Sequence, residues 1–154
     1  MTVKAIPEGY HSVTPYIIVK GAAKALDFYA RAFGAKEKFR LPMGDIIGHA
    51  EIVIGDSHVM LADVMDDQHK DPRKLGGTPV SLMIYTSDAD AMFKRAIAAG
   101  AKQLKPVEDQ FYGDRCGVLE DPFGHVWSIA THVEDLTPEE IAERGKAAMA
   151  AMGG

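Results

Sequence analysis

The hydrophobic and polar positions of the first third of the chain follow two different periods. Residues 13–19 are mostly β-branched or aromatic, which predicts a strand, and Pro15 restricts this strand to a sheet edge because proline has no N–H to donate. Apolar residues then recur every three or four positions over residues 22–33, which predicts an amphipathic helix that ends at Gly34. Three further strands are predicted, at residues 36–40, 48–54 and 58–62.

The second half of the chain repeats this order of elements. Residues 80–85 predict a strand, and Asp88 can accept hydrogen bonds from the first amides of a helix predicted over residues 89–99. A polar stretch at about residues 65–78 has no apolar period and separates the two halves. The pattern therefore predicts a strand–helix–strands unit, a linker and a second such unit.

Aligning the glycines that end the two predicted helices, Gly34 and Gly100, sets the register of the repeat. In this alignment Ile18 of the first unit falls on Ile84 of the second. Self-similarity of this kind at a fixed offset is typical of tandem copies of one supersecondary unit.

The end of the chain predicts a helix of its own, at about residues 137–151. Thr137 is a typical N-cap residue, Pro138 fits the first helical position, and Glu140 stands where it can complete a capping box.

Composition narrows the functional classes. The chain has 154 residues, of which 47% are hydrophobic and 25% charged, as in an ordinary globular domain. A net charge of −5 without a cationic stripe argues against a nucleic-acid partner, and no apolar run approaches the ~20 residues of a membrane span. Cys116 stands alone, and the first residues do not resemble a signal peptide, so we expect a soluble cytoplasmic protein.

Several segments together resemble one protein family. In the first half these are residues 14–16, 25–29 and 33–35, and in the second half residues 110–115 and 120–129, which include the run Asp-Pro-Phe-Gly-His. In this order they resemble the vicinal oxygen chelate superfamily of glyoxalase I, bleomycin-resistance proteins and extradiol dioxygenases. The second-half segments are similar to its PhnB-like branch.

The resemblance implies a single α+β domain made of two tandem βαβββ modules. Their curved mixed sheets would form a cleft, with the helices on the convex side and a C-terminal helix added. Module one would span about residues 10–64, the linker about 65–78, and module two about 79–132. The resemblance also implies a homodimer, in which the modules pair within one chain or between chains.

Metal-dependent members of this family hold a divalent ion with side chains from the first and last strands of each module. The alignment places Thr14, Leu61, Ser81 and Ser128 at these positions. None of them is an ordinary ligand for zinc or a related ion, so we predict that the family's metal site is missing and that no cofactor is bound.

His49 and Glu51 are the strongest candidates for other chemistry. They are two residues apart on a predicted strand, so their side chains share one face, which we expect to be the cleft. Three hypotheses remain open: a displaced metal site with a third ligand such as His58 or Asp63, a general base at Glu51, or ordinary polar residues on a solvated strand.

The segment 110–115 offers further candidates. Arg115 suits a carboxylate or phosphate group of a ligand, although it could equally pair with a nearby acid, and Tyr112 could supply a wall of the site. Trp127 is expected in the core, and Cys116 has no activating partner. The histidines outside residues 49 and 58 are expected at turns or on the surface.

The sequence thus predicts a binding protein for a small organic ligand, of the glyoxalase and bleomycin-resistance type. The predicted ligand-binding residues are Thr14, Tyr16, His49, Glu51, Ser81, Tyr112, Arg115 and Ser128. The alternative is a lyase or isomerase of glyoxalase type that uses a displaced metal or Glu51.

Overall fold

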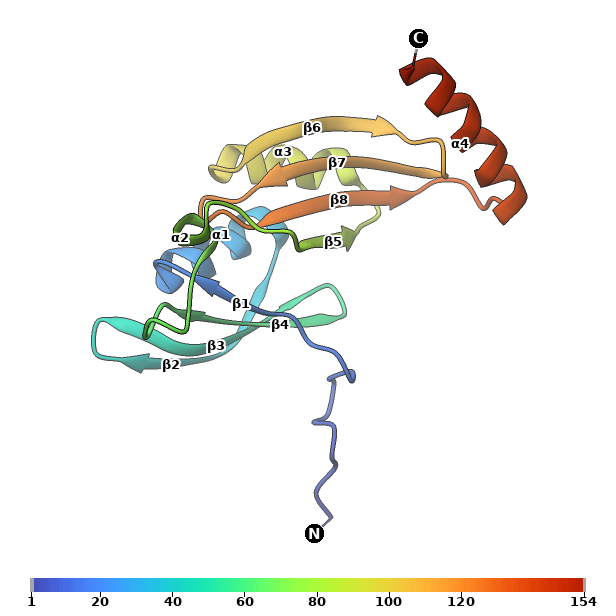
Figure 1. Cartoon of the computed structure of the whole chain (residues 1–154). Coiled ribbons are helices and arrows are strands. Elements are labelled where there is room, and N and C mark those ends of the chain that lie inside the picture. The colour runs from blue at the N-terminus through green and yellow to red at the C-terminus, as the bar shows by residue number, and fades with distance from the viewer. Residues whose placement is uncertain (1, 154) are drawn as a thin grey trace.

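Two four-stranded sheets, each backed by one long helix, form the body of the protein (Figure 1). The computed structural model describes residues 2–153. The first half contains β1 (Tyr16–Val19), α1 (Ala22–Phe33), β2 (Lys36–Met43), β3 (Ile46–Ile54) and β4 (Ser57–Asp63). A short helix, α2 (Pro72–Leu75), lies in the stretch predicted as a linker, and it was not expected. The second half contains β5 (Ser81–Tyr85), α3 (Ala89–Ala99), β6 (Lys102–Asp109), β7 (Asp114–Glu120) and β8 (Val126–His132), and α4 (Pro138–Met152) follows.

The two halves have the same topology. The strand orders are β1-β4-β3-β2 and β5-β8-β7-β6, with the first strand of each half parallel to the last and the other pairs antiparallel. This confirms the predicted α+β fold of two βαβββ modules with a C-terminal helix. β1 is an edge strand, as Pro15 predicted, but it begins at Tyr16, and Thr14 precedes it.

The N-terminus of the main helix in each module is held by the end of that module's last strand. In module one the Asp63 carboxylate accepts hydrogen bonds from the backbone N–H groups of Gly21, Ala22 and Ile47, each at 2.8 Å. In module two the Thr131 hydroxyl accepts the N–H of Ala89 at 2.9 Å. The helix ends are therefore satisfied from a distance, because α1 has no side-chain cap of its own.

The hydrophobic core lies between the sheets and the helices α1 and α3, which contact each other. Aromatic rings of α1 pack against the second module, with the Tyr29 and Trp127 centroids 5.5 Å apart. As predicted, Trp127 belongs to the core, with 1% of its surface exposed.

Asp121 joins the two modules inside this core. Its carboxylate accepts hydrogen bonds from the Tyr29 hydroxyl at 2.6 Å, from Trp127 Nε1 at 2.9 Å and from the N–H groups of Phe123 and His125. Burial and the nearby charge of Asp121 raise the pKa of Tyr29 well above its usual value, so the phenol stays protonated. The Asp-Pro-Phe-Gly-His run is thus a structural turn that binds α1 to module two.

The face of each sheet that points away from α1 and α3 is here called the open face. On β3, Ala50, Ile52 and Ile54 are buried in the core, so His49 and Glu51 lie on the open face as predicted. On β8, Trp127 and Ile129 are buried, which leaves Ser128 on the open face.

The prediction that Leu61 faces the cleft is wrong. Leu61 is fully buried in the core that packs against α1. The cause is the alignment of Ile18 with Ile84. Ile84 is a core residue of β5, but its counterpart in β1 is Ile17, and a slip of one residue along a strand moves each side chain to the opposite face.

Helix α4 lies beyond the end of the second sheet, where β8 leaves the body (Figure 1). The predicted capping box is confirmed, because Thr137 accepts from the N–H of Glu140 and the Glu140 side chain accepts from the N–H of Thr137. Arg144 of the helix binds Glu134 through both of its terminal nitrogens. Within the described residues, no helix is long and apolar enough to cross a membrane.

Candidate functional site

A chain of three hydrogen-bonded side chains crosses the open face of module one. The Tyr16 hydroxyl lies 2.9 Å from Nδ1 of His49, and Nε2 of His49 lies 2.9 Å from Oε2 of Glu51. Tyr16 comes from β1, while His49 and Glu51 come from β3, and Met60 of β4 is the register partner of both Tyr16 and Glu51. The fold therefore brings together three of the predicted ligand-binding residues.

The partners determine where the protons lie. A carboxylate only accepts hydrogen bonds, so Nε2 of His49 carries a hydrogen and donates it to Glu51. In the neutral ring Nδ1 is then the acceptor, and it receives the hydrogen bond of the Tyr16 hydroxyl. Both ring nitrogens are occupied, and the free end of the chain is the half-exposed phenol of Tyr16.

Apolar side chains surround this chain. Phe39, Leu41 and Met43 of β2 remain between 45% and 48% exposed. The centroid of the Phe39 ring lies 6.2 Å from that of His49, and Phe39 and Glu51 are register partners. Large apolar side chains left open around a few polar groups are typical of a binding surface.

The open face also shows which residues replace the family's metal ligands. Met60 and Ala62 of β4, and Ser128 and Ala130 of β8, stand on this face of the last strands. This set does not fit a transition metal, which needs several His, Cys, Asp or Glu donors. Of the third ligands considered for a displaced site, Asp63 is held at the N-terminus of α1. Among residues 2–153 no three such donors converge on one point.

Module two carries a polar cluster at the corresponding place, which the sequence did not reveal. The Tyr85 hydroxyl donates to Asp114 at 2.7 Å, and Nδ1 of His132 lies 2.8 Å from the other oxygen of the same carboxylate. Nε2 of His132 in turn lies 2.7 Å from Asp135. Hydrogen bonds to Asp114 and Asp135 raise the pKa of His132 above its usual value.

The signal for this cluster was weak. Asp114 belongs to the segment quoted for the family resemblance, but His132 looked like an ordinary surface residue. Asp114 and His132 are register partners on β7 and β8, and no local pattern announces such a pairing.

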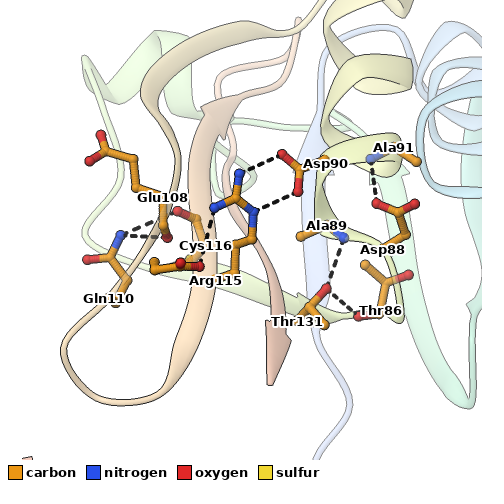
Figure 2. Close-up of polar contacts among 11 residues, drawn as sticks. Thr86, Asp88, Ala89, Asp90, Ala91, Glu108, Gln110, Arg115, Cys116 and Thr131 are labelled. Atoms are coloured by element: carbon orange, nitrogen blue, oxygen red, sulfur yellow. Dashed lines mark hydrogen bonds and ion pairs between the residues drawn. The ribbon is translucent and has the colours of Figure 1, made fainter. Parts of the chain in front are cut away.

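Arg115 lies on the opposite side of the sheet, beside α3 (Figure 2). Its guanidinium binds both oxygens of Asp90, at 2.7 and 3.0 Å, and one oxygen of Asp109 at 3.2 Å. These partners raise the pKa of Arg115 and lower that of Asp90. The pairing with a nearby acid, which was one of the two sequence interpretations, is what the structure shows, and it leaves little of the fork for a ligand.

The remaining predicted residues are scattered. Ser81 is exposed on the open face of β5, and its neighbour on that face, Met83, is the register partner of Ser128. Tyr112 is half-buried in the turn between β6 and β7, and burial raises its pKa. Thr14 lies in the segment before β1 and lines a cavity between the modules. Cys116 is buried and its pKa is raised by that burial, so its thiol stays protonated.

Comparisons with known proteins agree with this geometry. A family model described as the Glyoxalase/Bleomycin resistance protein/Dioxygenase superfamily matches residues 9–129. An uncharacterized protein of Mycobacterium tuberculosis is 41% identical over 147 residues, which cover 92% of this chain and 84% of that relative. An uncharacterized protein of Arabidopsis thaliana is 27% identical over 124 residues, covering 75% of this chain and 74% of the relative.

Solved structures share the fold. The crystal structure of TioX from Micromonospora sp. ML1 is similar with a TM-score of 0.63 and 26% identity, covering 82% of this chain and 100% of that one. An Arabidopsis thaliana gene product gives a TM-score of 0.65 and 27% identity, with coverage of 79% and 98%. A PhnB protein from Bacillus cereus gives 0.60 at 16% identity, covering 79% and 99%, which shows the fold alone.

Proposed function

The chain belongs to the glyoxalase, bleomycin resistance protein and dioxygenase superfamily, and from this premise we propose that it binds a small organic molecule on its open face, without the family's metal. The observation that carries the proposal is the Tyr16–His49–Glu51 chain, held in an apolar surface. A flat apolar compound can cover Phe39 and Leu41 while its polar group exchanges hydrogen bonds with Tyr16. Ser81 and Ser128 offer hydroxyl groups on the same face of module two.

Part of this surface is expected to be covered by a second copy of the chain. Large apolar residues of both modules are about half exposed on the open faces, including Met43 at 48% and Met83 at 49%. Such surfaces are normally covered by a ligand or a partner. In the proposed homodimer the two open faces enclose the ligand, whichever modules pair.

The proposal is tested by thermal-shift screening of planar aromatic compounds that carry a hydroxyl or carbonyl group, on protein dialysed against chelator. We expect hits whose affinity falls about tenfold in Tyr16→Phe, since a lost hydrogen bond costs about 1.4 kcal/mol. Arg115→Gln is the matched control and should leave the affinity unchanged. Hits that depend on Arg115 but not on Tyr16 would move the site to the helix side, and a metal requirement would contradict the metal-free site.

The same chain supports a second candidate function, a metal-free proton transfer. With Glu51 holding the Nε2 hydrogen of His49, the free Nδ1 can take the phenolic proton of Tyr16. The resulting phenolate could remove a proton from carbon next to a carbonyl group, while the imidazolium stays paired with Glu51. Chelator-treated protein should then exchange solvent deuterium into dihydroxyacetone, and Glu51→Gln should abolish the exchange. Exchange at the uncatalysed rate would leave binding as the function.

A further inference from the structure

A second cavity, separate from the open face, lies at the junction of the two modules. Its volume is about 740 Å³, within the range of small-molecule pockets. Its apolar wall is formed by core residues of both modules, namely Phe33, Leu82, Ile84, Met92 and Trp127. None of the three residues of the Tyr16–His49–Glu51 chain lines it.

The polar end of the cavity is formed by the first residues of β4 and the segment before β1. His58, Thr14 and Asp56 line it there. The ring of His58 stacks on Tyr10, with centroids 4.0 Å apart, which fixes the plane of the imidazole. His58 therefore meets the cavity as a rigid group.

The hydrogen bonds of His58 determine its proton. Its Nε2 lies 3.3 Å from Nζ of Lys38, and an ammonium group can only donate, so Nε2 is the acceptor. In the neutral ring the hydrogen is then on Nδ1. Among the described residues this Nδ1 has no hydrogen-bond partner, although it is shielded from solvent. A shielded N–H without an acceptor is unfavourable, and a ligand atom that accepts its hydrogen bond removes that cost.

The charges around the rim select the acceptor. The carboxylate of Asp56 lines the same end of the cavity and opposes an anionic ligand. The Ser57 hydroxyl is already bound to Asp56 and is not free to neutralise it. A neutral carbonyl oxygen satisfies His58 without this repulsion.

We propose that the junction cavity binds a neutral, flat and largely apolar compound whose carbonyl oxygen accepts a hydrogen bond from Nδ1 of His58. Aromatic ketones and related fused-ring carbonyl compounds have this chemistry. The proposal goes beyond the open-face function and does not depend on it.

Trp127, the sole tryptophan of the chain, lines the cavity and provides the measurement. The full-length protein is titrated with 9-fluorenone and, separately, with fluorene, which has nearly the same shape but no carbonyl oxygen. We expect saturable quenching of tryptophan emission by both, with fluorenone bound about tenfold more tightly, the usual effect of one hydrogen bond. Equal affinities, or no saturable quenching by fluorenone, would overturn the proposal without any variant.

Three variants locate the effect. His58→Phe keeps a ring to stack on Tyr10 but has no N–H, so fluorenone should bind only as well as fluorene. Leu82→Phe fills part of the cavity and should weaken both ligands at least tenfold. His49→Phe disrupts the open face and should change neither affinity. Sensitivity to His49→Phe together with indifference to Leu82→Phe would assign the quenching to the open face and refute the junction site.

Discussion

The open faces of the two modules carry similar groups in opposite arrangements. In module one a histidine stands in the middle, between the phenol of Tyr16 and the carboxylate of Glu51. In module two a carboxylate, Asp114, stands in the middle, between the phenol of Tyr85 and the imidazole of His132. The His49 side chain is 25% exposed and Asp114 only 5%, so the central group of module one meets the solvent and that of module two does not.

This difference separates a site from a support. A buried carboxylate must be fully hydrogen-bonded, and Asp114 uses its partners for that purpose. The chain of module one ends instead in a half-exposed phenol that can exchange its partner for a ligand. Duplication of one module thus left a reactive surface on one copy and a structural cluster on the other.

Breaking the connection between the modules should have the largest effect. In Asp121→Ala four hydrogen bonds are lost, and the Tyr29 hydroxyl and Trp127 N–H are left buried without an acceptor. We expect the free energy of unfolding to fall by about 4 kcal/mol, as when a buried polar network is broken. Urea denaturation measures it. Asp67→Ala, at an exposed position, is the control, and a similar loss there would contradict the assignment to Asp121.

The helix caps provide the next comparison. Asp63→Ala removes an ionised acceptor from three N–H groups, and we expect a loss of about 3 kcal/mol. Thr131→Val removes a neutral acceptor from one N–H, together with a bond to the Thr86 carbonyl (Figure 2), and should cost about 1 kcal/mol. Urea midpoints of the two variants give the ratio, and equal losses would show that charge at the cap is unimportant.

Removing each phenol tests the comparison directly. Tyr85→Phe takes a donor from the buried Asp114 and should cost about 1.5 kcal/mol, as for a hydrogen bond to a charged group. Tyr16→Phe breaks a bond at a half-exposed site and should cost about 0.5 kcal/mol. Thermal unfolding of both variants measures the order, and a larger loss for Tyr16 would place the support in module one.

The smallest expected effect is a pH dependence that belongs to module two. Because the pKa of folded His132 is raised, its stabilising contribution is fully present below its unfolded value of 6.5 and is lost as the pH rises through the folded pKa. Urea midpoints of the wild type should therefore decline over this interval relative to those of His132→Gln. Parallel midpoints for the two proteins, or an NMR titration that finds His132 below its ordinary pKa, would contradict this.

Much of the fold could be predicted because its signals are local. The helix over residues 89–99 is found at the predicted residues, and α4 has its predicted capping box. The alternation of β3 placed His49 and Glu51 correctly on one face. These features depend on neighbours a few positions away along the chain.

The rest depends on pairings between distant segments. Leu61 was placed on the wrong face because a repeat alignment cannot fix strand register to one residue. The side on which Arg115 lies, and its partner Asp90 on α3, follow from how the helix crosses the sheet. The cluster of Asp114 and His132 forms only when β7 pairs with β8.

The helix caps have a consequence for dividing the protein. Asp63 closes α1 and Thr131 closes α3, so each module supplies the acceptor for its own helix. A chain cut between residues 64 and 71 severs neither cap and interrupts no strand. The two modules are thus natural fragments for complementation: expressed as separate polypeptides, they can reassemble through the Tyr29–Asp121 bond and the shared aromatic core.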